Sequence, residues 1–259
     1  MKSLYIKNFK NIRELNLPRI GKVNLIVGKN SVGKSTLLEA ISLYLSNAND
    51  DGMRLVLNSR GETLARVMDD ERENINKQHY LSLFTGHKED YSENFYIEVA
   101  EGKDDFRSLK INQVYLVEEQ INEIDAARVR ISMLSKEDME ERADSLNVYG
   151  LGLCVKNGNT SSPVPYARGR MLPQMGKKMN FEYVHTSDFN TDNNAMLFDR
   201  VSLSPEEKYI IQALQVINPR ITRINYLNND SQRKSEDRIP TVTLEGDSQR
   251  YRLSSMGDG

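Results

Sequence analysis

The chain has 259 residues, of which 38% are hydrophobic and 28% are charged, and its formal net charge is −2. This length suits one large domain or two small ones, and the composition is typical of a soluble globular protein with a modest core. It excludes a polycationic chain, and no apolar run approaches the length of a membrane span. The N-terminus lacks a signal-peptide segment, and Cys154 stands alone, which excludes a disulfide framework and a thiolate metal site. We therefore expect the cytoplasm as the compartment and no membrane partner.

The first half of the chain contains short periodic segments. Alternating or β-branched runs predict strands at residues 4–9, 12–17, 23–27, 95–99, 106–111 and 114–117. Apolar residues at helical spacing predict helices at residues 37–45 and 62–84, separated by a break at 47–52.

The second half is less regular. Residues 118–146 are rich in acidic side chains and predict a charged helical segment, whereas clusters of Gly, Pro and Ser predict a loop at 150–178. Together they suggest an insertion spanning residues 118–180. Ser204 as N-cap and Pro205 as the first residue predict a helix that ends near Asn218. Further strands are predicted at 181–185, 221–227, 241–245 and 251–253.

One interval of the second half is basic. Residues 145–181 contain no Asp or Glu, and their five cationic side chains are Lys156, Arg168, Arg170, Lys177 and Lys178. Such a segment either contacts the phosphates of a nucleic acid or forms a solvated loop, and the sequence leaves both possibilities open.

Residues 28–36 carry the phosphate-binding pattern G-x-x-x-x-G-K-[ST] between a predicted strand and a predicted helix. This context fits the pattern because the glycines let backbone N–H groups converge on an anion at the positive end of the helix dipole. Lys34 is predicted to reach the β- and γ-phosphates, and the Ser35 hydroxyl to ligate Mg²⁺. We therefore expect the chain to bind a nucleoside triphosphate with Mg²⁺. The predicted binding residues are Gly28, Lys29, Asn30, Ser31, Val32, Gly33, Lys34, Ser35 and Thr36.

Residues 4–11 and 24–41 resemble the head of an SMC/RecF-type ATPase within the ABC-type P-loop class. The shared text is I-x-N-F at residues 6–9 and G-x-N-x-x-G-K-S from Gly28 onward, and Asn30 within the loop is typical of this branch. The resemblance implies ATP as the nucleotide. It also implies an α/β fold for residues 1–259, namely a P-loop NTPase with an ABC-ATPase-like head, an antiparallel β-subdomain, and the C-terminal part of the core missing.

The tail at residues 253–259, Leu-Ser-Ser-Met-Gly-Asp-Gly, resembles the ABC signature segment in the form found in OLD-like and abortive-infection ATPases. The signature residues are then Ser254, Ser255, Gly257 and Gly259, with either Ser254 or Gly257 at the serine position of the motif. In that family the signature of one head touches the nucleotide of another. The resemblance therefore implies an ATP-dependent homodimer or higher homo-oligomer.

The resemblance also implies a Walker B strand ending in Asp-Glu after the signature, but the sequence stops at Gly259. The catalytic residues thus stay unknown, and we expect a truncated form that does not hydrolyse ATP alone. Glu118 and Glu119 follow an apolar run in the outline of a Walker B, but the Asp is lacking, which favours a plain strand.

By resemblance, the parent protein is an ATP-hydrolysing component of DNA repair or anti-phage defence that gates an effector nuclease or toxin. The alternative is a nucleotide-gated nucleic-acid-binding or scaffold module without turnover. A GTPase is disfavoured because no N-K-x-D base-reading motif is present.

Overall fold

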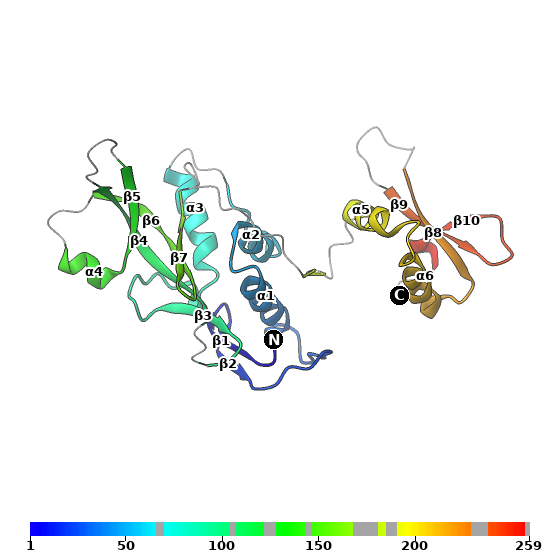
Figure 1. The fold of residues 1–259 in the computed structure, drawn as a ribbon, viewed down its shortest axis with the longest axis horizontal. Coiled ribbons are helices and arrows are strands. Elements are labelled where there is room, and N and C mark those ends of the chain that lie inside the picture. The colour runs from blue at the N-terminus through cyan, green and yellow to red at the C-terminus, as the bar shows by residue number, and fades with distance from the viewer. Residues whose placement is uncertain are drawn as a thin grey trace. The chain divides into compact units, whose positions relative to one another are not determined.

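The computed structural model describes residues 1–65, 70–103, 107–121, 128–142, 147–167, 181–184, 191–228 and 238–256. The chain divides into two compact units, Met1–Tyr183 and Val184–Gly259 (Figure 1). Each unit has its own sheet and its own hydrophobic core.

The first unit is built on a seven-stranded antiparallel sheet in the order β2-β1-β3-β4-β6-β7, and β5 pairs with one end of β4. The strands are β1 Leu4–Phe9, β2 Ile12–Leu17, β3 Tyr96–Ala100, β4 Leu109–Ile121, β5 Arg128–Leu134, β6 Asn147–Asn157 and β7 Thr160–Pro165. The pair β1–β2 confirms the strands predicted at 4–9 and 12–17, and the pair β3–β4 confirms a hairpin in which the strands start at Tyr96 and Leu109, one and three residues later than predicted. The run predicted as a separate strand at 114–117 continues β4 instead.

Three helices cover one face of this sheet: α1 Lys34–Leu45, α2 Asp50–Asn58 and α3 Asp70–Leu81. Alternate strand residues such as Ile97, Val99 and Ile111 are fully buried against helical side chains, among them Leu43 and Val56. The alternation of a strand places every second side chain on one face, so this apolar set forms a single core. On the opposite face, Glu98 of β3 pairs with Lys110 of β4, whereas Val114 and Leu116 farther along β4 form a second, smaller apolar cluster.

Two helix predictions in this unit need correction. The break at 47–52 is the start of α2, because the Asn49 side chain caps the helix by accepting a hydrogen bond from the Gly52 N–H at 2.8 Å. The helix predicted at 62–84 is shorter. Residues 62–65 are not helical, residues 66–69 lie outside the described part, and α3 starts at Asp70.

In its described residues, 118–121 and 128–142, the acidic segment is mostly strand rather than helix. Ile131 and Met133 alternate along β5 and pack on Val114 and Leu116, a period of two that the flanking acidic residues obscured. Within these two ranges only α4, Lys136–Glu141, is helical.

The loop predicted at 150–178 begins with a hairpin instead, formed by β6 and β7. A Cβ at Gly152 would lie 2.6 Å from the Val164 carbonyl oxygen, so this glycine permits a close approach of two strands and does not mark a turn. The described residues of the suggested insertion therefore extend the sheet. Residues 181–184 form no strand.

The strand predicted at 23–27 is also absent. No described strand pairs with this run, and Val23, Leu25 and Val27 are 92%, 87% and 78% exposed. The run is apolar, as a strand prediction requires. A strand also needs a neighbouring strand to complete its backbone hydrogen bonds, and this run has no such partner among the described residues.

The second unit consists of α5 Thr191–Val201, α6 Glu207–Ile217, β8 Ile221–Asn228, β9 Arg238–Leu244 and β10 Arg250–Arg252. The strands form an antiparallel sheet in the order β10-β9-β8, which confirms the three predicted strands. Helix α5 was not predicted. The start of α6 lies two residues later than expected: Ser204 Oγ accepts from the Glu206 N–H at 3.2 Å, and the N-cap is Glu206.

Candidate nucleotide-binding site

The glycine-rich loop opens directly into α1. Gly33 is the N-cap of the helix with a φ of 100°, in the left-handed region that glycine adopts without strain, and its carbonyl accepts the first helical hydrogen bond from the Leu37 N–H at 3.0 Å. A Cβ at Gly33 would approach the Asn11 side chain to 3.1 Å. Glycine is therefore required here both for the backbone turn and for the space beside the β1–β2 turn.

Lys34 lies across the loop. Its ammonium donates to the carbonyl oxygens of Gly28 at 2.9 Å and Lys29 at 2.7 Å. An ammonium has three donors, so these two bonds hold the side chain over the loop and leave one donor for an anion. Ser35 is exposed in the first turn of α1, whereas Thr36 is buried at 4% exposure. Of these two hydroxyls, only that of Ser35 faces solvent, where a cation could meet it.

The loop borders a cleft of about 910 Å³, within the range of small-molecule sites. Its walls come from four places: the β1–β2 turn, the loop with the start of α1, the segment after α2, and the segment after α3. The lining residues are Lys10, Asn11, Arg13, Asn30, Ser31, Gly33, Lys34, Ser35, Thr36, Arg60, Glu62, Ser82, Thr85, Gly86 and His87. Four of these side chains are permanent cations and one is a carboxylate, so the cleft favours an anionic ligand.

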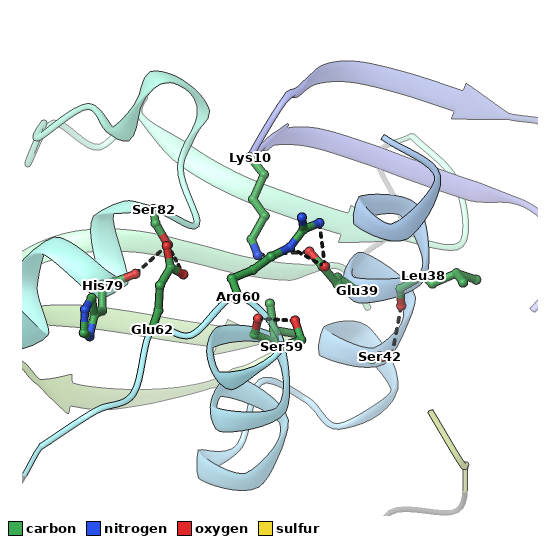
Figure 2. A network of polar contacts seen from close by, with 10 residues as sticks. Lys10, Leu38, Glu39, Ser42, Ser59, Arg60, Glu62, His79 and Ser82 are labelled. Atoms are coloured by element: carbon green, nitrogen blue, oxygen red, sulfur yellow. Dashed lines mark hydrogen bonds and ion pairs between the residues drawn. The ribbon is translucent and has the colours of Figure 1, made fainter. Parts of the chain in front are cut away.

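Two of the cations share a buried carboxylate below the cleft (Figure 2). Glu39, on the inner side of α1, is 1% exposed. Its Oε2 lies 2.9 Å from Lys10 Nζ, and its Oε1 accepts a hydrogen bond from Arg60 Nε at 2.9 Å and lies 2.8 Å from Arg60 Nη2. The Lys10 ammonium makes no aligned hydrogen bond with any described residue, so the ion pair is its principal contact. Glu39 thus joins the β1–β2 turn and the end of α2 to the helix that follows the loop.

The environment of Glu39 extends to Tyr183. Burial, followed by the charge of Glu39, raises the pKa of the Tyr183 hydroxyl above its usual value. The cleft carboxylate Glu62 is engaged as well, because it accepts a hydrogen bond from the Ser82 hydroxyl at 2.7 Å.

The structure gathers the predicted loop residues at one site and leaves other predictions open. Six of the nine line the cleft. Ser254 and Ser255 are exposed in a short 3₁₀ turn at Leu253–Met256, and Gly257 and Gly259 lie outside the described residues. Lys156 is exposed on β6, whereas Arg168, Arg170, Lys177 and Lys178 also lie outside the described part. Glu118 lies on β4 and does not line the cleft.

The charged residues of the site that sequence reasoning missed are Lys10, Arg13, Glu39, Arg60 and Glu62. Lys10 follows the I-x-N-F run, so the resemblance itself offered a signal. The sequence around Arg60 gave no signal of a role in the site, because this residue follows α2, a helix that was not predicted.

Residues 1–246 match the family described as AAA ATPase domain. The chain belongs to this family. It falls in the SMC/RecF-like class of P-loop ATPases, as the resemblance of its N-terminal residues implied. Among the described residues of this AAA ATPase domain, no helix is long and apolar enough to cross a membrane.

Two curated relatives are similar to parts of the chain. An uncharacterized protein of Methanocaldococcus jannaschii is 50% identical over 46 residues, which is 18% of this chain and 21% of the relative. The DNA replication and repair protein RecF of Clostridioides difficile is 31% identical over 140 residues, 54% of this chain and 32% of the relative. The matches thus span a third or less of these relatives' own length. No solved structure matches the AAA ATPase domain.

Proposed function

We propose that this AAA ATPase domain binds ATP with Mg²⁺ through residues 28–36. The observation that carries the proposal is the Lys34 ammonium held across a glycine loop at the N-terminus of α1, in a cleft lined by three further cations. Phosphate oxygens would accept hydrogen bonds from the loop N–H groups and from Lys34. Arg13, which is exposed, and Arg60, which is 44% exposed, also line the cleft and can offer N–H donors to phosphate oxygens.

Magnesium fits the same site. Mg²⁺ is usually held by one or two protein ligands together with substrate phosphates, and the exposed Ser35 hydroxyl offers one such ligand beside the loop. No cluster of three or more His, Cys, Asp or Glu side chains forms elsewhere in the described part of the chain. When bound, the ion would neutralise phosphate charge, while Lys34 and the loop amides orient the phosphate chain.

Hydrolysis requires more than binding. A water-activating carboxylate must stand free beside the terminal phosphate. Within the described residues, Glu62 is the only carboxylate that lines the cleft, and it is hydrogen-bonded to Ser82, whereas Glu39 is buried between two cations. We therefore propose that residues 1–259 bind ATP with negligible turnover, and that hydrolysis belongs to a longer parent protein. A measured turnover in the ordinary enzyme range, about 1–10³ s⁻¹, would contradict this.

Titration calorimetry with ATP–Mg²⁺ tests binding. Lys34→Ala removes a charge-assisted contact worth about 1.5–3 kcal/mol, so affinity should fall about 10- to 150-fold. Lys22→Ala is the matched control, because Lys22 is exposed six residues before the loop and does not line the cleft. Equal affinity of wild type and Lys34→Ala would refute the assignment.

The cellular role that we propose for the protein is taken from the SMC/RecF-like class of ATPases. The RecF relative is named for DNA replication and repair, which supports a role in DNA repair. We propose anti-phage defence and the gating of a nuclease or toxin only from the resemblance of the sequence to OLD-like ATPases. A nucleotide-gated scaffold without turnover is the alternative. Turnover by residues 1–259 is negligible in both cases, so the measurement that separates them is ATP hydrolysis by the longer parent protein.

We further propose that ATP drives a two-fold dimer in which the segment 253–259 of one copy contacts the nucleotide of the other. Sedimentation with a non-hydrolysable ATP analogue should show a dimer for wild type but not for Ser254→Arg or Gly257→Arg. An identical response of all three proteins would contradict the signature assignment.

A further inference from the structure

Two helices of the second unit pack on one face of its sheet (Figure 1). We call the other face the open face; its edges are exposed, and its central Thr241 is buried at 8% exposure. Phe198 of α5 and Leu214 of α6 pack with Ile224 and Val242 of the sheet in a single core. Both helices therefore lie on the same side. On the other side, no described helix covers the strands.

Three arginines share the open face. In the antiparallel registers, Arg223 of β8 is opposite Thr243 of β9, which is opposite Arg250 of β10. In the next row of the same parity, Asn225 is opposite Thr241, which is opposite Arg252. Side chains at paired positions lie on one face of a sheet, and the intervening row, Ile224, Val242 and Tyr251, belongs to the core. We call Arg223, Arg250 and Arg252 the arginine face.

The arginine face lacks counter-charges among the described residues. All three side chains are exposed, and none of their guanidinium groups forms an ion pair or a hydrogen bond with a described residue. The nearby carboxylate of Asp247 is already occupied by the Tyr251 hydroxyl and the Gln249 N–H, and Glu245 is exposed beyond the end of β9.

Several cations on the two sheets are paired within the described residues. On the open face of the first sheet, Lys110 is paired with Glu98 at 3.6 Å and Lys103 with Glu14 at 3.4 Å. In the second unit, Arg238 forms a two-pronged ion pair with Asp199. Like charges gathered on one small sheet without partners repel one another, so the arginine face is an arrangement that an anionic partner would stabilise.

The spacing and chemistry of this face fit a phosphate backbone. Neighbouring strands lie about 4.8 Å apart and alternate residues about 7 Å apart, so the three guanidinium groups span roughly 10 Å across and 7 Å along the sheet. Arginine binds phosphate in a two-pronged geometry. The two rows that carry the arginines contain threonine and asparagine, and the next row of the same face is Leu227 opposite Ile239. The centres of protein–protein interfaces are poor in charge, so three arginines fit a phosphate backbone better than a protein partner.

We infer that the arginine face binds the sugar-phosphate backbone of DNA. The inference rests on the proposed function as a DNA-repair or defence ATPase, and it places the contact outside residues 156–178. Because backbone contacts read no base edges, binding is expected to be independent of sequence and strongly dependent on salt.

Fluorescence anisotropy of the whole chain with a labelled duplex, in a potassium chloride series without nucleotide, tests the inference. Each neutralised phosphate contributes about −0.9 to the slope of log affinity against log salt, so three contacts contribute about −2.7, or roughly 40-fold between 50 and 200 mM. The triple variant Arg223→Gln, Arg250→Gln, Arg252→Gln should lose that share of the slope. The triple Arg→Lys variant should keep it.

Two control variants separate this face from other cationic surfaces. The first control variant removes three positive charges, as the arginine variant does, but from exposed positions outside the sheet of the second unit: Lys136→Gln, Arg200→Gln and Lys208→Gln. It should leave the salt dependence of DNA binding unchanged. A second control variant replaces the cations of the basic segment predicted from the sequence and tests whether that segment binds DNA. Its substitutions are Arg168→Gln, Arg170→Gln, Lys177→Gln and Lys178→Gln. Circular dichroism and the single Arg→Gln variants guard against a triple variant that does not fold.

Several results would overturn the inference: no DNA binding by the wild-type chain, a wild-type slope in the triple Gln variant, or loss of binding only in the 168–178 variant. Polyglutamate that competes with DNA at equal charge concentration would assign the face to an acidic protein instead. ATP affinity is measured separately. Lys34→Ala should lose nucleotide and keep DNA binding, whereas the arginine variants should do the reverse, so failure of one proposal is distinguishable from failure of the other.

Discussion

The buried carboxylate of Glu39 is expected to be among the most sensitive positions of the first unit. Glu39→Gln keeps the size of the side chain and removes its charge, which leaves the Lys10 ammonium without its ion-pair partner. Lys10 has little access to water, since its side chain is 11% exposed, whereas that of Arg60 is 44% exposed and can turn toward solvent. The loss should therefore come mainly from Lys10.

The size of the effect follows from this asymmetry. Removing one partner of a buried ion pair costs about 3–5 kcal/mol, whereas a surface pair is worth about 0–1 kcal/mol. With one buried and one half-exposed cation, we expect a loss near the lower limit, about 3 kcal/mol. For a unit of this size, 1 kcal/mol shifts the melting temperature by about 2–4 °C, so Glu39→Gln should lower it by about 6–12 °C.

Thermal unfolding followed by circular dichroism measures this loss. Glu14→Gln is the control, because Glu14 is 57% exposed and its pair with Lys103 should contribute less than about 0.5 kcal/mol. Adding Lys10→Met to Glu39→Gln removes the stranded ammonium and should restore part of the stability, with a coupling energy of about 0.5–3 kcal/mol. If the Glu39→Gln protein has the same melting temperature as the wild type, the reasoning is refuted.

Three further substitutions test the packing of the first unit by the same unfolding measurement. Gly152→Ala should cost about 1–3 kcal/mol, because a Cβ there meets the Val164 carbonyl, whereas Gly150→Ala, with open space around it, should be close to neutral; equal melting of the two contradicts this. Asn76→Ala should cost about 3 kcal/mol, because the fully buried amide bonds the Ala65 N–H and carbonyl and the Tyr166 carbonyl; a loss below about 1 kcal/mol would argue against that role. Hydrogen bonds from Lys88 and Ser92 lower the pKa of Asp90 to about 2, so its carboxylate stabilises the fold above pH 4, and this contribution is lost as the pH falls from 4 through 2. Asp90→Asn should therefore cost up to about 1 kcal/mol at pH 7, given its solvent exposure, and progressively less as the pH falls through 2; a loss independent of pH would be inconsistent with the lowered pKa.

The sequence predicted those parts of the fold and site that depend on local patterns. The strands β1, β2, β8, β9 and β10 alternate clearly, and the loop at 28–36 carries its own chemistry in nine residues. These features could be read without knowledge of distant contacts.

The parts that were missed depend on residues far apart in sequence. The acidic side chains around β5 favoured the prediction of a helix. In the structure Ile131 and Met133 pack on Val114 and Leu116 of the neighbouring strand, and this contact explains why the segment is a strand. Lys10 and Arg60 both pair with Glu39, although they are fifty residues apart in the sequence. The periodicity of a sequence does not indicate contacts between residues so far apart. The arginine face depends on strand register, which only the paired structure supplies.

The uncovered apolar run at Val23–Val27 has a practical consequence for any study of this chain in solution. Its free amide and carbonyl groups, together with exposed valine and leucine side chains, offer a template on which a second polypeptide can add as a strand. Association by this route would increase with protein concentration and would not depend on ATP. It would therefore mimic the nucleotide-driven dimer unless the two are separated. A lysine at Leu25 should suppress the strand-mediated association and leave the glycine loop intact, which would make Leu25→Lys a suitable background for measuring assembly.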